Sequence, residues 1–331
     1  MNKKNRGDTN QIFIDANYGI RGYEPENESE KPELLNDPKI EAYLCRPQAA
    51  SLELSMGFLD AAIIGEDWVR EVGVNGQNSS VRRIGDLEYG QTKLIIGVPA
   101  ESDYSSLSDL FRTFEKRTRP ILCFTEYPYL TRDWVMNSEG YRELFGDQKP
   151  IVQIGNSIEG KNERVQIIKS EGVTEGYIAK SNDASEDGDG DIKFIVDNTQ
   201  TGSTLKKYNL RILEPLKPIL ESSAGLYAGP KCVGWKEEKA QEIFRNLYGV
   251  VDGRKYSDVK FNVPVFQVSA VEEYLITEGL CADEPTIVVG KRFAQVNILI
   301  PKGRFPQILD TLTQKYNASG ILSSDMKQYI K

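Results

Sequence analysis

The sequence of 331 residues contains no histidine. Its absence excludes a Ser-His-Asp triad, a Cys-His pair and any imidazole ligand to a metal. A general base in this protein must therefore be a carboxylate, lysine, tyrosine or cysteine. Any bound metal is expected to be a hard, oxygen-liganded ion such as Mg²⁺.

Cysteine is also scarce, and the four residues are widely separated with no CxxC pair: Cys45, Cys123, Cys232 and Cys281. This spacing indicates neither a zinc site nor a disulfide framework. We expect reduced thiols, as in a cytoplasmic protein. The sequence MNKKNRGDTNQ lacks the apolar stretch of a signal peptide, and no run is long and apolar enough to span a bilayer, so no membrane partner is expected.

Basic residues do not outnumber acidic ones: 41 Lys and Arg stand against 49 Asp and Glu, which gives a net charge of -8. This balance argues against nonspecific nucleic-acid binding, which needs an excess of basic residues on one face. The 39% hydrophobic and 27% charged residues suit a soluble globular chain. An anionic substrate would need local backbone amides, a few basic residues or Mg²⁺.

Strands and helices alternate through most of the chain, which predicts an α/β protein with a largely buried sheet. The first forty residues are polar and are expected to be irregular. The early strands are expected at 41–46, 61–65, 81–88 and 92–100. A second α/β part begins near residue 102, with expected helices at 106–117, 129–141 and 161–172. After residue 258 the order becomes βαββαβ, which is typical of a ferredoxin-like module.

The strongest motif for chemistry is IVDNTQTGSTLKKYNL, in which an apolar strand leads into a polar turn and a short helix. Successive amides, hydroxyls and the helix N-terminus could bind one anion there. Gly202 would allow close approach of the backbone, and Asp197 could bind ribose hydroxyls or Mg²⁺. An N-capped helix, in which Ser and Thr only satisfy amides, is an equally supported interpretation.

Asp197 followed by TGSTL resembles the phosphoribosyl pyrophosphate loop of the ATP phosphoribosyltransferase family. The resemblance implies that the 5′-phosphate of the donor is bound by Thr201, Gly202, Ser203, Thr204 and Leu205. It also implies a catalytic role for Asp197 near the ribose or the metal. The sequence that follows, LRILEPLKPILESSAGLYAGP, is similar to the family as well.

Further segments resemble the family in the expected order: RP at 46–47, GFLDAAIIGED at 57–67, DLEYGQTKLIIGVP at 86–99, TEYP at 125–128 and GNSIE at 155–159. The last two are expected to begin helices. The resemblance implies a catalytic role for Arg46 and a nucleotide site formed by Asp60, Gly65, Asp67 and Glu159. A surface ion pair for Arg46, and turn or N-cap roles for Asp60 and Asp67, are about as well supported.

The resemblance implies a two-lobed, periplasmic-binding-protein-like α/β body with a C-terminal ferredoxin-like regulatory domain. The expected boundaries are 1–98 with 192–230 for lobe I, 99–191 for lobe II and 231–331 for the regulatory domain. In the family this last domain binds histidine as a feedback inhibitor and helps to assemble hexamers. A homo-oligomer, either a dimer or a hexamer, is therefore expected.

One segment departs from the family, whose members open with a buried strand and a lysine-glycine-arginine-leucine turn. Here Lys4, Asn5 and Arg6 are at most a degraded copy of that turn, with no strand before it. The implied activity is the condensation of ATP with phosphoribosyl pyrophosphate at the entry to histidine biosynthesis, with Mg²⁺ carried by the donor. The departure leaves open a catalytically impaired ligand-binding or regulatory homologue. A solute receptor outside the membrane is disfavoured by the lack of a signal peptide.

Overall fold

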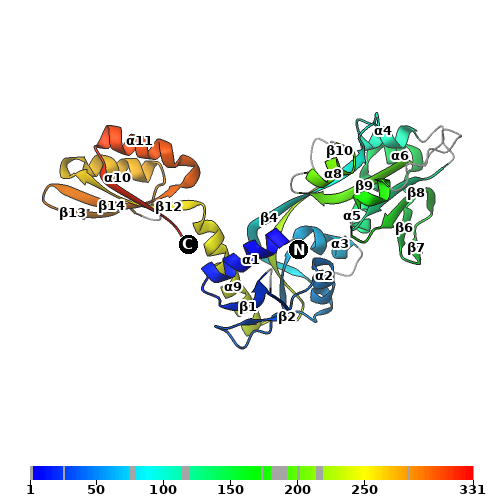
Figure 1. Ribbon diagram of the computed structural model, residues 1–331, viewed down its shortest axis with the longest axis horizontal. Coiled ribbons are helices and arrows are strands. Elements are labelled where there is room, and N and C mark those ends of the chain that lie inside the picture. Colours follow the sequence, from blue (N-terminus) through cyan, green and yellow to red (C-terminus); the bar gives the residue numbers. More distant parts are fainter. Residues whose placement is uncertain are drawn as a thin grey trace. The chain divides into compact units, whose positions relative to one another are not determined.

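The computed structural model describes residues 3–24, 27–74, 80–113, 119–172, 174–179, 192–199, 202–213, 219–281 and 284–330 (Figure 1). The chain forms two compact units. One is Cys45–Ala240, and the other combines Met1–Leu44 with Gln241–Lys331. Among the described residues, no helix has the length and apolarity needed to cross a membrane. The lobe boundaries expected from the sequence stay a prediction.

The Cys45–Ala240 unit is built on one mixed sheet. Its strands are β3 (Ala61–Gly65), β4 (Arg82–Pro99), β5 (Ile121–Thr125), β6 (Pro150–Ile154), β7 (Ser157–Glu159), β8 (Asn162–Lys169), β9 (Ile192–Thr199), β10 (Leu210–Leu213) and β11 (Leu220–Ala228). The strand order is β3-β11-β4-β9-β5-β8-β6-β7, and β10 also pairs with β4. Strands β9, β5, β8 and β6 run parallel to one another.

Strand β4 joins the two parts of this sheet, and its 18 residues replace the two separate strands expected at 81–88 and 92–100. Its first part pairs with β11, and its last residues pair with β9 and β10. Positive φ angles at Glu88 and Gly90 occur where the register to β11 shifts. Figure 1 shows β4 running from the part with α2 (Pro47–Met56) and α3 (Glu66–Val74) towards the part with α4 (Leu107–Arg112).

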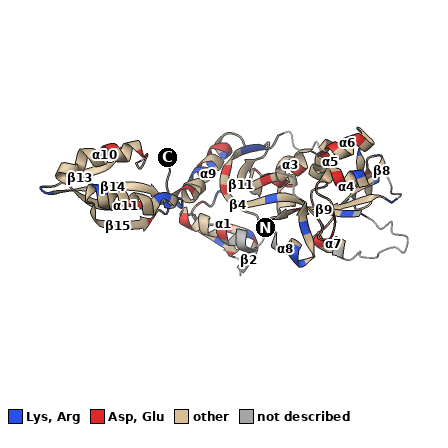
Figure 2. Cartoon of the chain, turned by 90° about the horizontal axis from the view of Figure 1, so that it is seen from above, with Lys and Arg blue, Asp and Glu red and all other residues tan. Residues whose placement is uncertain are grey.

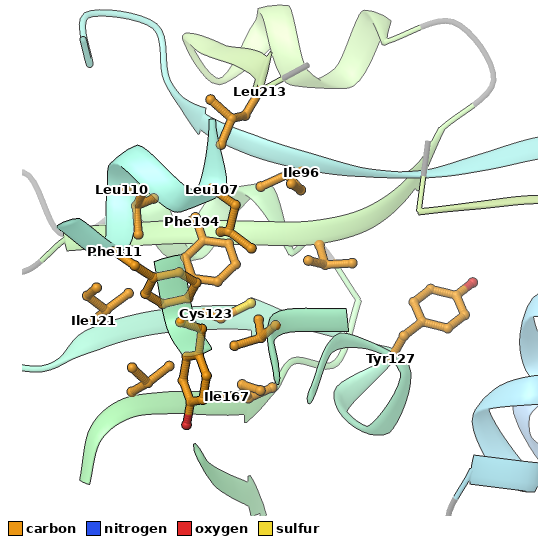
Figure 3. Packing of buried hydrophobic residues seen from close by; sticks show 14 of the residues in the cluster. Ile96, Leu107, Leu110, Phe111, Ile121, Cys123, Tyr127, Ile167, Phe194 and Leu213 are labelled. Carbon is orange, nitrogen blue, oxygen red and sulfur yellow. The ribbon is translucent and has the colours of Figure 1, made fainter. Parts of the chain in front are cut away.

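The second part of the sheet carries the main core of the unit. Its helices are α4, α5 (Pro128–Asn137), α6 (Glu139–Phe145), α7 (Glu175–Ala179) and α8 (Ser203–Lys207). Helix α4 and β5, β8 and β9 bury side chains that cluster in Figure 3, including Phe111, Cys123, Ile167 and Phe194. Full burial of each large apolar side chain contributes roughly 1.5–3 kcal/mol relative to exposure. The predicted α/β class is confirmed.

Several expected elements in this unit are wrong. The segment 161–172, expected as a helix, contains β8, because Val165 and Ile167 alternate into the core while β5 and β6 pair with the strand on both sides. The helix start expected at 155–159 is instead the β6–β7 hairpin. The helix expected at 129–141 is divided at Ser138, where the backbone is extended, into α5 and α6.

The C-terminal module has the predicted βαββαβ order. Its elements are β12 (Tyr256–Pro264), α10 (Val268–Thr277), β13 (Thr286–Val289), β14 (Phe293–Pro301), α11 (Phe305–Tyr316) and β15 (Ser319–Asp325). The sheet order is β13-β14-β12-β15, and every pair is antiparallel. This confirms the ferredoxin-like topology. Alternate residues of β12 and β14, including Val259, Phe261, Val296 and Ile298, pack with α10 and α11 in one core.

The described residues of the N-terminal segment form regular elements, which corrects the expectation of an irregular segment. They form α1 (Lys3–Asp15), β1 (Ile20–Glu24) and β2 (Asn27–Leu34). These residues are held because Ile12 is buried, because Asp15 pairs with Arg254 at 2.9 Å, and because Asn246 of α9 (Trp235–Gly253) bonds the Tyr18 hydroxyl at 3.0 Å. The strand expected at 41–46 is reduced to a single bridge between Glu33 and Glu41.

Candidate functional site

The carboxyl ends of β5, β8 and β9 meet at one edge of the sheet, since these strands are parallel neighbours. Ligands of open α/β sheets bind at such an edge. The segments that leave these strands are bonded to each other. The Ser170 amide donates to the Thr125 carbonyl at 2.9 Å, and the Gly172 amide donates to Glu126 Oε1 at 3.1 Å. We take this edge as the candidate site.

Asp67 links this edge to the first part of the sheet. Its buried carboxylate lies in the first turn of α3 and accepts hydrogen bonds from Ser222 Oγ at 2.7 Å and Tyr127 Oη at 2.6 Å. Tyr127 Oη in turn accepts a bond from Asn198 Nδ2 at 2.7 Å. In Figure 3 the Tyr127 ring extends away from the apolar cluster, with its hydroxyl directed outwards. One network therefore joins α3, β11, the β5–α5 turn and β9.

Gly65, at the end of β3, makes this arrangement possible. A Cβ atom at this position would lie 2.1 Å from Asp67 Oδ1 and 3.2 Å from Ser222 Oγ. Any larger residue would therefore collide with the buried carboxylate. The glycine and the aspartate of the sequence motif are thus explained by one close contact, which the sequence pattern alone does not reveal.

Asp197 is half-buried near the end of β9, and its Oδ1 accepts the Asn198 amide at 2.7 Å. Burial is the main cause that raises the pKa of Asp197 to about 7; the charges of Glu175 and Glu126 also act to raise it, and the Asn198 amide acts to lower it. A carboxyl with this pKa can exchange a proton near neutral pH, or ionise when a cation approaches. Figure 2 shows the acidic residue of α7 and the basic residues of α8, the two short helices that flank β9 in the chain.

The proposed phosphate loop begins at Gly202, which has a φ of 70° and occupies the N-cap position of α8. Because the N-cap residue is a glycine, it has no side chain to cap the helix, and the choice between a phosphate loop and a turn whose Ser and Thr only satisfy amides stays open. The Gly202 amide itself donates to Thr199 Oγ1 at 2.7 Å. Thr204 is exposed and Leu205 is buried in a small apolar cluster. Thr201 and the side chain of Ser203 lie outside the described residues.

The remaining predicted residues are dispersed. Arg46 is exposed at the N-cap of α2, with no ion pair to another described residue, and Gln48 two positions later bonds Glu126 at 3.4 Å. The N-terminus of α2 therefore lies beside the candidate site. Asp60 precedes β3 at the end opposite Asp67 and pairs with Lys236 at 2.7 Å. Glu159 is exposed on β7 and accepts a bond from Tyr129 Oη at 3.5 Å. The binding roles of all these residues stay predictions.

Sequence reasoning missed Glu71, a second buried carboxylate on α3, one turn after Asp67. Its Oε1 accepts the Tyr129 amide at 3.0 Å and its Oε2 accepts the Leu130 amide at 2.8 Å. Burial raises the pKa of Glu71 to about 7, while these amides and the charges of Lys169 and Arg132 act to lower it. An acidic residue four positions after Asp67, and so on the same helix face, was the available signal.

In the described part of the chain, no group of three or more acidic or thiol side chains could hold a metal ion. The expected Mg²⁺ is carried by the pyrophosphate donor, with Asp197 near the ribose or the metal, and this expectation stays a prediction. The charges of Glu175 and Glu126 act on Asp197 electrostatically.

Comparison with known proteins adds independent evidence. The family model described as ATP phosphoribosyltransferase matches residues 46–249. An ATP phosphoribosyltransferase from Pelotomaculum thermopropionicum is 28% identical over 88% of this chain and 88% of its own length. One from Thermodesulfovibrio yellowstonii is 24% identical over 97% of this chain and 94% of its own length. A chain of the ATP phosphoribosyl transferase (HisG:HisZ) complex from Thermotoga maritima superposes with a TM-score of 0.47 and 19% identity, covering 74% of this chain and 92% of that chain.

Proposed function

Because this chain belongs to the ATP phosphoribosyltransferase family, we propose that it condenses ATP with phosphoribosyl pyrophosphate to phosphoribosyl-ATP and pyrophosphate, the first step of histidine biosynthesis. One observation carries the proposal. The network of Asp67, Tyr127 and Asn198 ends beside Asp197, at the carboxyl ends of the parallel strands and directly before the Gly202 turn.

In the proposed reaction, the lone pair of adenine N1 forms a bond to C1 of the ribose. The bond from C1 to the pyrophosphate oxygen breaks, and its electron pair leaves with magnesium pyrophosphate. Positive charge develops on the ribose ring as this occurs. The protein must then hold both substrates in line and present negative charge to the ring, with little acid-base chemistry, which suits a chain without histidine.

Asp197 is the proposed catalytic carboxylate. The Mg²⁺ that arrives with the donor would favour its ionised form and return its pKa towards the ordinary range. In that form it can bind ribose hydroxyls and stabilise the developing charge. Arg46, exposed two positions before the Gln48 that bonds Glu126, is proposed to contact the pyrophosphate. Thr201 to Leu205 are proposed to hold the 5′-phosphate, and Asp60, Gly65, Asp67 and Glu159 to form the nucleotide side.

The ferredoxin-like domain, 231–331, is proposed to bind histidine as a feedback inhibitor and to support a dimer or hexamer in the cytoplasm. The proposed catalytic lobes are 1–98 with 192–230, and 99–191. The long form of the family, with this regulatory domain at the C-terminus, is supported here by the βαββαβ topology.

A second candidate function is that of a catalytically impaired ligand-binding or regulatory homologue. It is favoured by Lys4 to Arg6, which lie within α1 and not in a turn that follows a strand. One experiment distinguishes the two candidate functions. The purified protein is mixed with ATP, phosphoribosyl pyrophosphate and Mg²⁺, and the release of pyrophosphate is measured. The binding of each substrate is measured separately by calorimetry. Release establishes the transferase, binding without release establishes the impaired homologue, and the lack of both refutes the proposed site.

A further inference from the structure

Helix α5 begins without a cap of its own. Tyr127 occupies its N-cap position, and no side-chain cap bond is made from there. Pro128 follows at the first helical position and has no amide hydrogen to satisfy. The next two amides, those of Tyr129 and Leu130, are therefore the ones that need acceptors. Both are bonded to the Glu71 carboxylate.

Glu71 belongs to α3, in the first part of the sheet, whereas α5 covers the second part. The cap of α5 thus comes from about sixty positions earlier in the chain. The carboxylate is only 6% exposed and has no ion-pair partner among the described residues. When the carboxylate is ionised, two amides at a helix N-terminus stabilise its charge, and the helix dipole there favours an anion. Lys169 of β8 and Arg132 of α5 also favour its charge.

The capped segment is the one that carries the site. Glu126 and Tyr127 immediately precede Pro128 and the two capped amides, and Tyr127 donates to Asp67 at 2.6 Å. Asp67 stands one helical turn before Glu71 on α3, so the same helix binds this segment twice. Glu126 meanwhile accepts the Gly172 amide at 3.1 Å. A movement of the α5 N-terminus would therefore displace Tyr127 from Asp67 and Glu126 from Gly172 together.

We propose that Glu71 is a positioning residue of the transfer reaction: by capping α5 from α3, it holds Tyr127 against Asp67 and Asn198. The proposal rests on the proposed function for its effect on turnover. Its structural part is independent of any activity, because the cap and the Tyr127 contact can be measured in the protein without substrate.

The first test measures amide exchange and fluorescence without substrate. Glu71→Ala should reduce protection of the Tyr129 and Leu130 amides by about tenfold or more, the factor that corresponds to about 1.4 kcal/mol. The ring of Trp68 lies against that of Tyr127, with 4.3 Å between the centroids and 31° between the planes, so the emission of Trp68 should change as well. The emission of Trp68 is measured in protein in which Trp134 and Trp235 are replaced by Phe. The control Glu163→Gln, on an exposed glutamate of β8, should change neither. If the Tyr129 and Leu130 amides kept their protection from exchange in Glu71→Ala, Glu71 would not be the cap of α5.

The second test measures turnover well below the melting temperature of every variant. Glu71→Ala should lower kcat by about tenfold or more with a smaller change in the donor KM, and Glu71→Gln, which keeps one acceptor oxygen, should recover part of the loss. Lost amide protection with an unchanged kcat would overturn the positioning role. If the unmodified protein released no pyrophosphate, the proposed function would fail, while the exchange and Trp68 results would still decide whether Glu71 holds Tyr127. If the emission of Trp68 were the same in Glu71→Ala as in the unmodified protein, Glu71 would not hold Tyr127 in place.

Discussion

Replacement of Gly65 by alanine tests the geometry of the Asp67 site most directly. The new Cβ would lie 2.1 Å from Asp67 Oδ1, whereas real Cβ contacts essentially never fall below 3.0 Å. The carboxylate oxygen must therefore move by at least about 0.9 Å (3.0 minus 2.1). Gly65 is not among the glycines with a positive φ, so the expected damage is steric and not conformational.

The cost of Gly65→Ala follows from the bonds that Asp67 would lose. Ser222 Oγ donates to the same Oδ1 at 2.7 Å, and a shift of this size breaks that bond. A buried hydrogen bond to a charged group is worth about 1.5–3 kcal/mol. For a domain the size of the Cys45–Ala240 unit, each kcal/mol lowers Tm by about 2–4 °C. We therefore expect a decrease in Tm of about 3–12 °C.

The measurement is thermal unfolding of Gly65→Ala beside Gly303→Ala, where the added Cβ meets nothing within 4 Å. A double-mutant cycle with Asp67→Ala identifies the cause. If the collision with the carboxylate is responsible, Gly65→Ala should cost little once that carboxylate is gone. A Tm for Gly65→Ala within about 1 °C of the unmodified protein, or an equal cost in both backgrounds, would refute this reasoning.

Four further predictions concern the proposed donor site. Because the folded-state pKa of Asp197 is raised to about 7 from about 3.9 when unfolded, its contribution to stability is complete below pH about 4 and disappears as the pH rises through 7. The free energy of unfolding should therefore decrease between pH 4 and 8 by up to about 4 kcal/mol less in Asp197→Asn than in the unmodified protein, as measured by denaturant unfolding. An identical pH dependence in both proteins would contradict the buried carboxyl. Gly202→Val should weaken phosphoribosyl pyrophosphate binding strongly, because φ is 70° there. Thr204→Ala should weaken the binding free energy of phosphoribosyl pyrophosphate by about 1–3 kcal/mol in calorimetric titration. An unchanged affinity in a folded Gly202→Val variant would refute the assignment of this turn as the phosphate loop. Turnover should require Mg²⁺ or Mn²⁺ carried by the donor, and full activity in excess chelator would argue against this.

The sequence determined the parts of this protein that local pattern encodes. Alternating apolar residues and short segments predicted the α/β class and the C-terminal βαββαβ order, because side chains on one face of a strand or helix recur at a fixed period. The motifs around Asp67 and Asp197 matched the ATP phosphoribosyltransferase family, to which residues 46–249 belong. The pairing of Gly65 with Asp67 was also visible as a motif, although its physical cause was not.

Tertiary structure decided what depends on distant neighbours. The segment of β8 is a strand because β5 and β6 pair with it on both sides, a contact that the pattern of 161–172 does not encode. The N-terminal helix is held by Asp15 and Tyr18 through residues more than two hundred positions away. The cap that Glu71 gives α5, and the bond from Tyr127 to Asp67, join parts of the chain about sixty residues apart. A local sequence pattern cannot specify such contacts, because only the packed sheet brings these side chains within hydrogen-bonding distance.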